Sequence, residues 1–150
     1  MTTQRKKVTV STLRTKKEKG EKAVFITSYD CPTAHFANQA DVDMILIGDS
    51  GAMALLGYNT TNEVSMDEML MMAKAVVRGN KHAFLVGDMP FLSYQISDEE
   101  AIRNAGKFIQ VGCDSIKLEG GQRMASRIKA ISDAGIAVMG HIGLTPQSMG

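Results

Sequence analysis

The chain contains Met44-Ile45-Leu46-Ile47-Gly48-Asp49, a short hydrophobic run that finishes on a carboxylate. Three further runs also finish on an ionisable residue: Ala83-Phe84-Leu85-Val86-Gly87-Asp88, Asp114-Ser115-Ile116-Lys117-Leu118-Glu119 and Ala137-Val138-Met139-Gly140-His141. The segments between them have helical spacing, and such unalternating runs are typical of buried parallel strands joined by βαβ crossovers. Because the carboxyl ends of these strands open toward one rim, we expect Asp49, Asp88, Glu119 and His141 to converge there.

The same rhythm runs along the whole chain. Strands are predicted at residues 23–28, 44–48, 83–87, 115–118 and 137–140, and helices at residues 32–40, 65–78, 98–111 and 122–133. Two architectures fit: an open doubly wound sheet, or a (β/α)₈ barrel that is a little over half built, since a barrel needs roughly 250 residues. No G-x-G-x-x-G motif follows a strand, and polar residues end consecutive strands, which favours the barrel without deciding the question.

Composition limits the class of protein. At 150 residues the chain fits one domain, residues 1–150, with enough length for a hydrophobic core. A net charge of +1 gives no reason to expect a nucleic-acid partner, and no apolar run approaches the ~20 residues of a membrane helix. Cys31 and Cys113 fit neither a metal-ligand spacing nor a disulfide framework, so we expect a cytoplasmic protein.

The first 22 residues are strongly basic. They carry eight Lys or Arg against Glu18 and Glu21, a balance of +6 that leaves −5 for the rest of the chain. A targeting peptide or a phosphate-binding arm would explain the charge, but presequences are normally poor in acids. We favour a solvated helix, capped by Ser11 or Thr12 and ended by Gly20.

The Gly-Asp pairs at the ends of two successive strands are candidates for a metal site. A single Asp after a strand is most often a helix cap or a turn former. Two such pairs, Gly48-Asp49 and Gly87-Asp88, would place carboxylates close together, where they raise each other's pKa unless a cation binds. Mg²⁺ takes oxygen ligands of this kind. The residues alone leave the metal and the structural interpretations equally open.

Lys117 and Glu119 are two residues apart on one predicted strand, so their side chains face the same side of the sheet. Lys117 is either a ligand for a substrate carboxylate or one half of a structural ion pair. Ser50 could bind an anionic group or cap the next segment, and His141 could be an acid, a base or a structural hydrogen-bonder. The spacing does not choose between these roles.

Five segments in order resemble the ketopantoate hydroxymethyltransferase family. The resemblance runs from about Val8 to the last residue, and the five together are highly specific although each one is weak alone. They are Ile26-Thr27-Ser28-Tyr29-Asp30, Ile47-Gly48-Asp49-Ser50, Val86-Gly87-Asp88-Met89-Pro90-Phe91, Ile116-Lys117-Leu118-Glu119-Gly120-Gly121 and Gly140-His141-Ile142-Gly143-Leu144-Thr145-Pro146-Gln147.

The resemblance implies a (β/α)₈ barrel of the phosphoenolpyruvate mutase and isocitrate lyase type, with about the first five βα units in this chain. It implies an enzyme that transfers a hydroxymethyl group from 5,10-methylenetetrahydrofolate to 3-methyl-2-oxobutanoate, giving ketopantoate on the route to pantothenate and coenzyme A. A metal, usually Mg²⁺, would be held by Asp49, Asp88 and Glu119, directly or through water. Ser50 and Lys117 would help to bind the oxo acid, and the metal would stabilise its enolate.

The family's general base is a Glu on a later strand, so the resemblance places it beyond Gly150, and no residue of this chain matches it. We therefore expect a fragment of a longer protein that is a homo-oligomer at full length. Residues 1–150 alone are expected to be inactive and poorly soluble, with His141 at most an auxiliary group. Two alternatives remain: a related lyase or mutase that acts on another 2-oxo acid, and a non-catalytic half-barrel.

Overall fold

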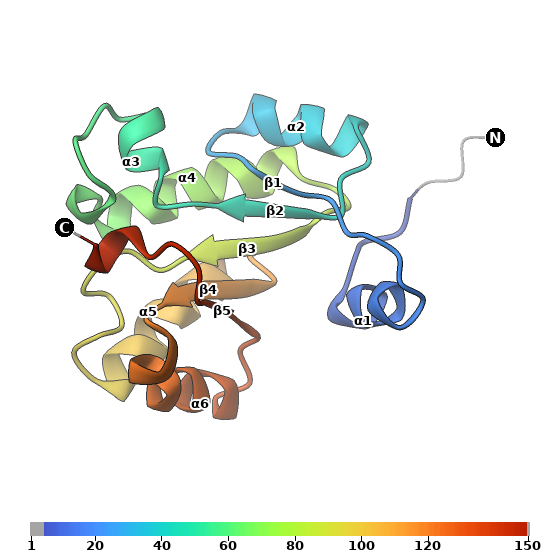
Figure 1. Ribbon diagram of the computed structural model, residues 1–150. Coiled ribbons are helices and arrows are strands. Elements are labelled where there is room, and N and C mark those ends of the chain that lie inside the picture. Colours follow the sequence, from blue (N-terminus) through green and yellow to red (C-terminus); the bar gives the residue numbers. More distant parts are fainter. Residues whose placement is uncertain (1–4, 150) are drawn as a thin grey trace.

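The computed structural model describes residues 5–149 (Figure 1). Strands and α-helices alternate along it, with short 3₁₀ turns between some of them. In chain order they are α1 (Val10–Glu18), β1 (Phe25–Thr27), α2 (Cys31–Gln39), β2 (Met44–Ile47), α3 (Gly51–Ala54), η1 (Thr61–Glu63), α4 (Met66–Gly79), β3 (Phe84–Asp88), α5 (Asp98–Val111), β4 (Ser115–Glu119), η2 (Gly121–Met124), α6 (Ala125–Asp133), β5 (Val138–His141) and η3 (Pro146–Ser148).

The strands form one parallel sheet in the order β1-β2-β3-β4-β5. Each strand is added beside the preceding one, and the order never reverses. A doubly wound sheet has a reversal point, so that alternative is wrong for this chain. Sequential addition of right-handed βαβ units is how a (β/α)₈ barrel is built.

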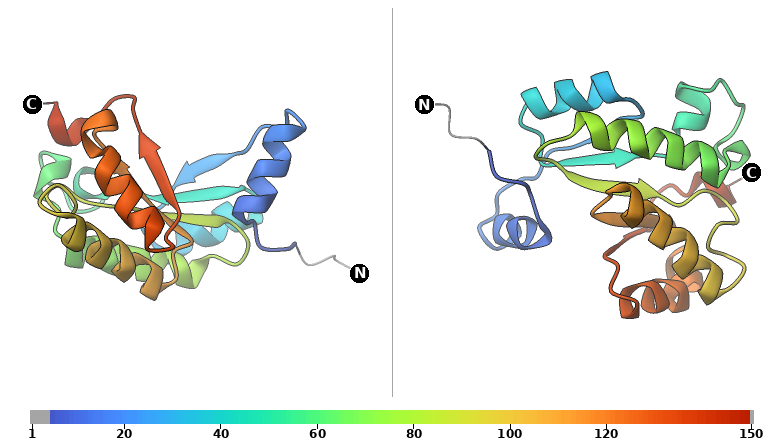
Figure 2. Two further views of the ribbon diagram at one scale, coloured as in Figure 1. Left: turned by 90° about the horizontal axis from the view of Figure 1, so that it is seen from below. Right: turned by 180° about the vertical axis from the view of Figure 1, so that it is seen from behind.

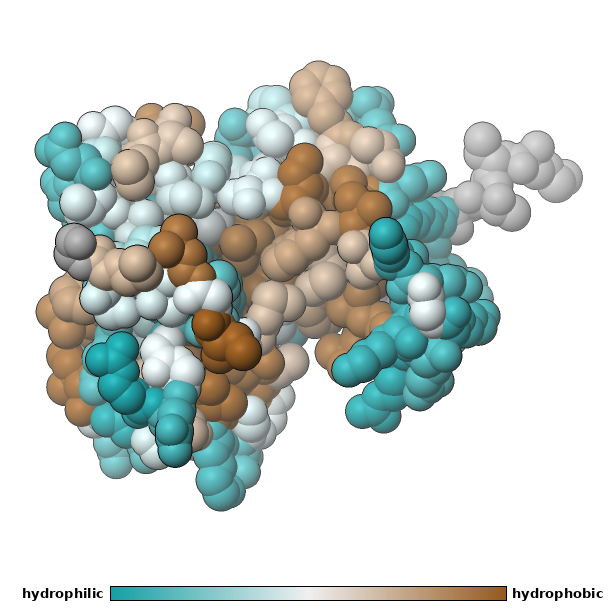
Figure 3. Space-filling model, in the orientation of Figure 1, coloured by the Kyte–Doolittle hydropathy of each residue, from teal (hydrophilic) through white to brown (hydrophobic). Residues whose placement is uncertain are grey.

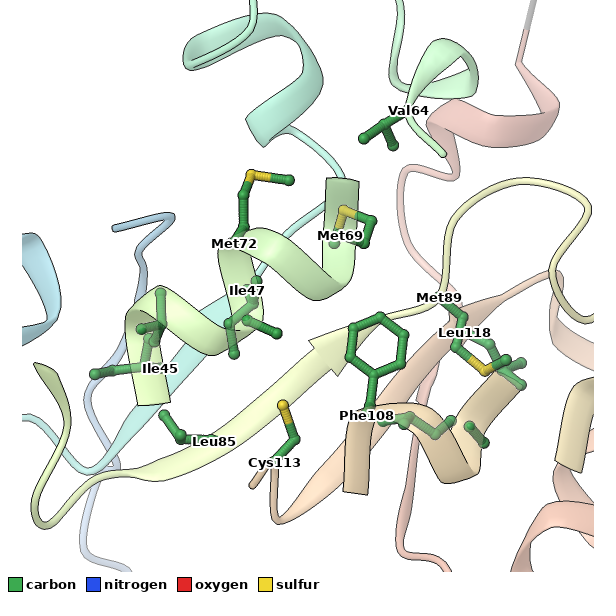
Figure 4. Close-up of a cluster of buried hydrophobic side chains, with 14 of the residues drawn as sticks. Ile45, Ile47, Val64, Met69, Met72, Leu85, Met89, Phe108, Cys113 and Leu118 are labelled. Carbon is green, nitrogen blue, oxygen red and sulfur yellow. The ribbon is translucent and has the colours of Figure 1, made fainter. Parts of the chain in front are cut away.

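Helices α2, α4, α5 and α6 cover one side of the curved sheet, and α1 lies on the other side (Figure 2). We call the helix-covered side the outer face and the opposite side the inner face. Between the outer face and the helices lies the larger core, which includes Ile45, Leu85, Met72 and Phe108, each at most 1% exposed (Figure 4). This packing fixes the strand ends that carry the polar residues.

Gly87 is required by this packing rather than by a ligand. A Cβ atom on Gly87 would lie 2.4 Å from Cδ1 of Phe108, which projects from α5 onto β3. The glycine of the Gly87-Asp88 pair therefore allows a helix to approach the strand closely.

The inner face is apolar toward the amino ends of the strands. Met44, Phe84 and Val86 form a second, smaller buried cluster with Val8, and Leu13 of α1 packs against it. Phe25, the first residue of the outermost strand β1, remains 41% exposed. Figure 3 shows hydrophobic surface gathered in the hollow between hydrophilic α1 and the rest of the molecule.

Most predicted elements are confirmed, with local corrections. The expected loop over residues 49–64 contains α3 and η1, and the helix expected over residues 122–133 starts as the 3₁₀ turn η2. The predicted basic helix exists as α1, but its cap is Thr9, which exchanges hydrogen bonds with Thr12. Within residues 5–149, no helix has the length and apolar character needed to span a bilayer.

Both ends of the chain lie outside the described residues. At the start these are residues 1–4 of the basic stretch, and at the end it is Gly150. The family's general base is expected beyond Gly150, so its position stays a prediction. The helix predicted within the basic stretch is described in full, because α1 begins at Val10.

Candidate metal and oxo-acid site

The carboxyl ends of three neighbouring strands bring the predicted acids to one edge of the sheet. Asp88 and Glu119 are the last residues of β3 and β4, and Asp49 follows β2 by two positions. All three are buried, as is Lys117, which pairs with Asp88 in the strand register. The even spacing of Phe84, Val86 and Asp88 along β3 puts the Asp88 side chain on the inner face.

Asp88 and Lys117 form a buried ion pair, with 2.7 Å between Lys117 Nζ and Asp88 Oδ1. The second oxygen of Asp88 accepts a hydrogen bond from the backbone N–H of Asp49 at 3.1 Å. Burial raises the pKa of Asp88 to about 7, because the Lys117 charge offsets only part of the lost hydration and Asp49 adds repulsion. Within the chain, Lys117 is therefore paired with Asp88, and its role toward a substrate carboxylate stays a prediction.

Glu119 differs from its neighbours because neither carboxylate oxygen has a hydrogen-bond partner. Both oxygens are buried and neither makes a hydrogen bond of normal geometry within residues 5–149, although the backbone N–H of Gln147 is near enough to favour the ionised form of Glu119 slightly. Burial raises the pKa of Glu119, with Asp49 contributing repulsion, while the Lys117 charge works in the opposite direction. A buried carboxylate without donors costs several kcal/mol if it stays ionised. Such a group therefore points to a missing proton or cation.

Gln147 of η3 also belongs to this edge. Its Nε2 donates to Asp49 Oδ2 at 2.9 Å and to the carbonyl of Met89 at 3.0 Å. Its Oε1 accepts from the Tyr94 hydroxyl at 2.7 Å. Neither Gln147 nor Tyr94 was predicted as a site residue. The position of Gln147 in the Leu144–Gln147 part of a matched motif was the one signal that could have indicated it.

Ser50 lies at the rim, half-buried, with its hydroxyl 2.9 Å from the hydroxyl of Tyr29. It occupies the N-cap position of α3, but its side chain makes no capping hydrogen bond. The interpretation of Ser50 as a side-chain cap is therefore wrong, and its hydroxyl lies among the polar groups at the carboxyl ends of the strands.

His141 ends β5 beside Glu119, its partner in the strand register. Its Nε2 is hydrogen-bonded to the carbonyl of Leu144, within the same loop. Within residues 5–149, His141 makes no hydrogen bond to Asp49, Asp88 or Lys117. The structure thus gives it a structural contact and a position at the margin of the acidic cluster.

No group of three or more His, Cys, Asp or Glu side chains in the described part of the chain has the arrangement of a ready metal site. The donor chemistry nevertheless suits a divalent cation, since Asp49, Asp88 and Glu119 offer carboxylate oxygens. The unpartnered oxygens of Glu119 are the specific feature that a cation would satisfy. Metal binding by these three acids stays a prediction.

A pocket of about 170 Å³ opens beside the acids. Glu119, Tyr94 and Gln147 line it together with Phe91 and Met124, and exposed Arg123 lies at its margin. Apolar residues and the acidic Glu119 thus line the same pocket.

Sequence comparison matches residues 7–150 to the model of a family described as ketopantoate hydroxymethyltransferase. The chain is 55% identical over 144 residues to a 3-methyl-2-oxobutanoate hydroxymethyltransferase of Syntrophomonas wolfei subsp. wolfei, covering 95% of this chain and 52% of that protein. A protein of the same name from Ignicoccus hospitalis is 52% identical over 142 residues, covering 95% of this chain and 54% of its own length. The chain thus spans about half the length of these curated relatives.

Solved structures with the same fold include a phosphonopyruvate hydrolase in complex with oxalate and Mg²⁺, with a TM-score of 0.71 and 17% identity. That similarity covers 85% of this chain and 50% of the hydrolase. A phosphoenolpyruvate phosphomutase from Streptomyces platensis subsp. rosaceus gives a TM-score of 0.70 at 16% identity, over 88% of this chain and 53% of its own. The predicted fold class is confirmed: the sheet and its helices match about half of chains with the barrel fold of the phosphoenolpyruvate mutase and isocitrate lyase type.

Proposed function

We propose, because this chain belongs to the ketopantoate hydroxymethyltransferase family, that the intact gene product converts 3-methyl-2-oxobutanoate to ketopantoate with 5,10-methylenetetrahydrofolate as the one-carbon donor. The observation that carries the proposal is the buried set of Asp49, Asp88, Lys117 and Glu119 at one edge of the sheet. These charges stabilise the fold poorly, since buried ion pairs rarely exceed their desolvation cost. Their presence in a family of this name supports a role in binding and chemistry.

Asp49, Asp88 and Glu119 would hold a divalent metal, usually Mg²⁺ in this family, directly or through water. When bound, the metal supplies Lewis acidity at the keto oxygen of the oxo acid. Glu119 has two buried oxygens without donors, and Asp88 already offers one oxygen to the backbone of Asp49. The carboxylates therefore provide negative charge where the substrate's keto and carboxylate oxygens would meet the metal.

Lys117 would neutralise the carboxylate of the oxo acid, with Ser50 as a second polar contact. Lys117 Nζ is buried and 2.7 Å from Asp88 Oδ1, so it is held in place before substrate arrives. Lys117→Ala is expected to raise KM strongly for 3-methyl-2-oxobutanoate and also to lower the Tm, because it leaves buried Asp88 without its charge partner. A purely structural ion pair predicts the lower Tm with KM nearly unchanged, so the change in KM separates the two roles.

The pocket lined by Phe91 and Met124 would receive the branched end of the oxo acid. Removal of the C3 proton needs a base within hydrogen-bond reach. His141 is engaged with the carbonyl of Leu144, which supports an auxiliary role for it. The base itself would be the family's Glu, which is expected beyond Gly150. Homo-oligomer formation and cytoplasmic location stay predictions.

Ketopantoate formation by the intact gene product tests the proposal. With 3-methyl-2-oxobutanoate, 5,10-methylenetetrahydrofolate and Mg²⁺ we expect product by NMR, and none after removal of divalent metal with EDTA. Asp49→Asn, which changes the charge with little change of shape, is expected to reduce the rate sharply. Cleavage or rearrangement of another 2-oxo acid, without hydroxymethyl transfer, would replace the proposal by the lyase or mutase alternative.

A further inference from the structure

Gln147 is a buried glutamine in a short turn, and both ends of its amide are used. It is 4% exposed, although η3 is only a three-residue turn after β5. Two acceptors face Nε2, namely Asp49 Oδ2 and the Met89 carbonyl. The Tyr94 hydroxyl faces Oε1. One side chain thereby joins the ends of β2 and β3 to the loop that leaves β3.

The orientation of the amide is dictated by these partners. A flipped amide would set its oxygen against a carboxylate and a carbonyl, both of which accept hydrogen bonds and donate none. Tyr94 supports the observed orientation, because its hydroxyl accepts from the backbone N–H of Glu119 at 3.3 Å. Its single proton faces two acceptors, Gln147 Oε1 at 2.7 Å and the carbonyl of Glu119 at 3.1 Å, and Gln147 Oε1 is the nearer.

The turn that carries Gln147 is also anchored from outside the site. Asn62 of η1 donates through its Nδ2 to the backbone carbonyl of Gln147 at 3.3 Å. The backbone of η3 is therefore held against η1 while the side chain reaches inward. A glutamine tethered at both ends has little freedom to move away from Asp49.

These contacts of Gln147 restrict the orientation of the Asp49 carboxylate. Its Oδ2 is occupied by Gln147 Nε2, whereas Oδ1 accepts no hydrogen bond from residues 5–149. A hydrogen bond to one oxygen stops rotation of the carboxylate and leaves the other oxygen for a ligand. Outer partners that orient a ligating group in this way typically contribute 10–100-fold to metal affinity.

We propose that Gln147, supported by Tyr94, is a positioning residue that fixes the carboxylate of Asp49 for binding a divalent cation. The inference rests on the proposed function, since it assumes that Asp49 is a metal ligand. Through this contact, the position of the segment after β5 would influence how tightly Asp49, which follows β2, binds the cation.

The test is the affinity of the intact gene product for Mn²⁺ alone, measured by electron paramagnetic resonance, without substrates. Gln147→Met keeps length and volume but removes both donors, and we expect about 10–100-fold weaker binding. Gln122→Met, an exposed glutamine of η2, is the matched control and is expected to bind like the parent. Tyr94→Phe removes the hydrogen bond to Gln147 Oε1 together with the contacts of the hydroxyl to the backbone of Glu119, and we expect a loss of about fivefold.

The double variant Gln147→Met/Tyr94→Phe shows whether the two residues act together. If Tyr94 acts through Gln147, it adds nothing to the loss caused by Gln147→Met alone. A Gln147→Met affinity equal to or higher than that of the parent overturns the inference. If Gln147→Met does not fold, an unchanged affinity in folded Tyr94→Phe overturns it equally. A parent that binds no Mn²⁺ refutes the metal site of the proposed function instead.

Discussion

Asp88 and Asp114 have the same kinds of partner at opposite edges of the sheet. Asp88 accepts from Lys117 Nζ at 2.7 Å and from the backbone N–H of Asp49 at 3.1 Å. Asp114, just before β4, accepts from Lys7 Nζ at 2.6 Å and from the backbone N–H of Leu85 at 2.7 Å. Their surroundings differ, since the side chain of Asp88 is 2% exposed and that of Asp114 is 27% exposed.

The contrast extends to the neighbouring acids. At the amino edge, Asp43 is buried but accepts from the backbone N–H of Val24, from Lys16 and from Arg5. At the carboxyl edge, Glu119 is equally buried and neither of its oxygens has a partner. Charges at the amino edge are thus matched by partners within the chain, whereas charges at the carboxyl edge are incompletely matched. Incomplete matching inside a folded protein is typical of a binding site.

The largest difference between the two edges is expected in oxo-acid binding, when Asp88 or Asp114 is replaced by alanine. Asp88→Ala is expected to abolish metal-dependent binding of 3-methyl-2-oxobutanoate, because it removes a predicted metal ligand and leaves Lys117 without its partner. Asp114→Ala is expected to leave that binding unchanged and to lower the Tm. Calorimetric titrations with and without Mg²⁺, beside thermal melts of both variants, measure this. Unchanged metal-dependent affinity in Asp88→Ala would remove Asp88 from the site.

A second variant separates stability from binding at the carboxyl edge. Asp88→Asn combined with Lys117→Gln replaces the buried ion pair by a neutral hydrogen-bonded pair and keeps an acceptor for the Asp49 N–H. Because both charges leave the interior together, we expect stability no lower than that of the parent and up to about 4 kcal/mol higher. Metal-dependent binding is expected to be lost. A large drop in the urea midpoint would show that this ion pair stabilises the fold.

The smallest effect is expected at the amino edge, from Asp43→Asn. Removing the charge weakens its bonds to Lys16, Arg5 and the Val24 N–H, at a cost of about 1.5–3 kcal/mol. Oxo-acid binding is expected to stay as in the parent. Urea denaturation of both proteins at neutral pH, with calorimetry as the binding control, checks this.

The same residue predicts a pH dependence. Burial opposes the shift, but the hydrogen bond from Val24 and the Lys16 and Arg5 charges lower the pKa of Asp43 below 3.8 in the folded state. A lowered folded pKa means that its stabilisation is complete above the unfolded pKa and is lost as the pH falls through the folded pKa. The parent should therefore lose more stability than Asp43→Asn as the pH falls below about 4. Parallel pH profiles would contradict this assignment.

Sequence patterns were sufficient for the order and nature of the main elements. Unalternating hydrophobic runs predicted β2 and β3, and helical spacing predicted α4, all near their observed bounds. The choice between an open sheet and a barrel needed the strand order, because periodicity describes each strand and not its neighbours. The packing role of Gly87 could not be predicted either, because the side chain that requires a glycine there is Phe108, which is 21 positions away in the sequence.

For the site, the strand-end rule predicted that Asp49, Asp88, Glu119 and His141 share one edge, and the two-residue spacing put Lys117 on the same side as Glu119. It could not find Gln147, because a turn residue is placed there by contacts to Tyr94 and Asn62, which lie on other loops. Nor could spacing decide the role of Ser50, whose hydroxyl contacts Tyr29 rather than capping α3. Contacts between loops depend on the assembled fold, and the local pattern does not contain them.

The acids at the carboxyl edge are proposed to hold a divalent cation for an oxo acid. Crystals of the intact gene product, grown with Mn²⁺ and 3-methyl-2-oxobutanoate, would test it by anomalous diffraction at the manganese edge. We predict one strong peak beside the carboxylates of Asp49 and Asp88, with oxo-acid density next to it and Lys117 near the acid's carboxylate. A fully loaded crystal with no peak at this edge, or with manganese and oxo acid bound elsewhere, would show that these acids do not form the metal site.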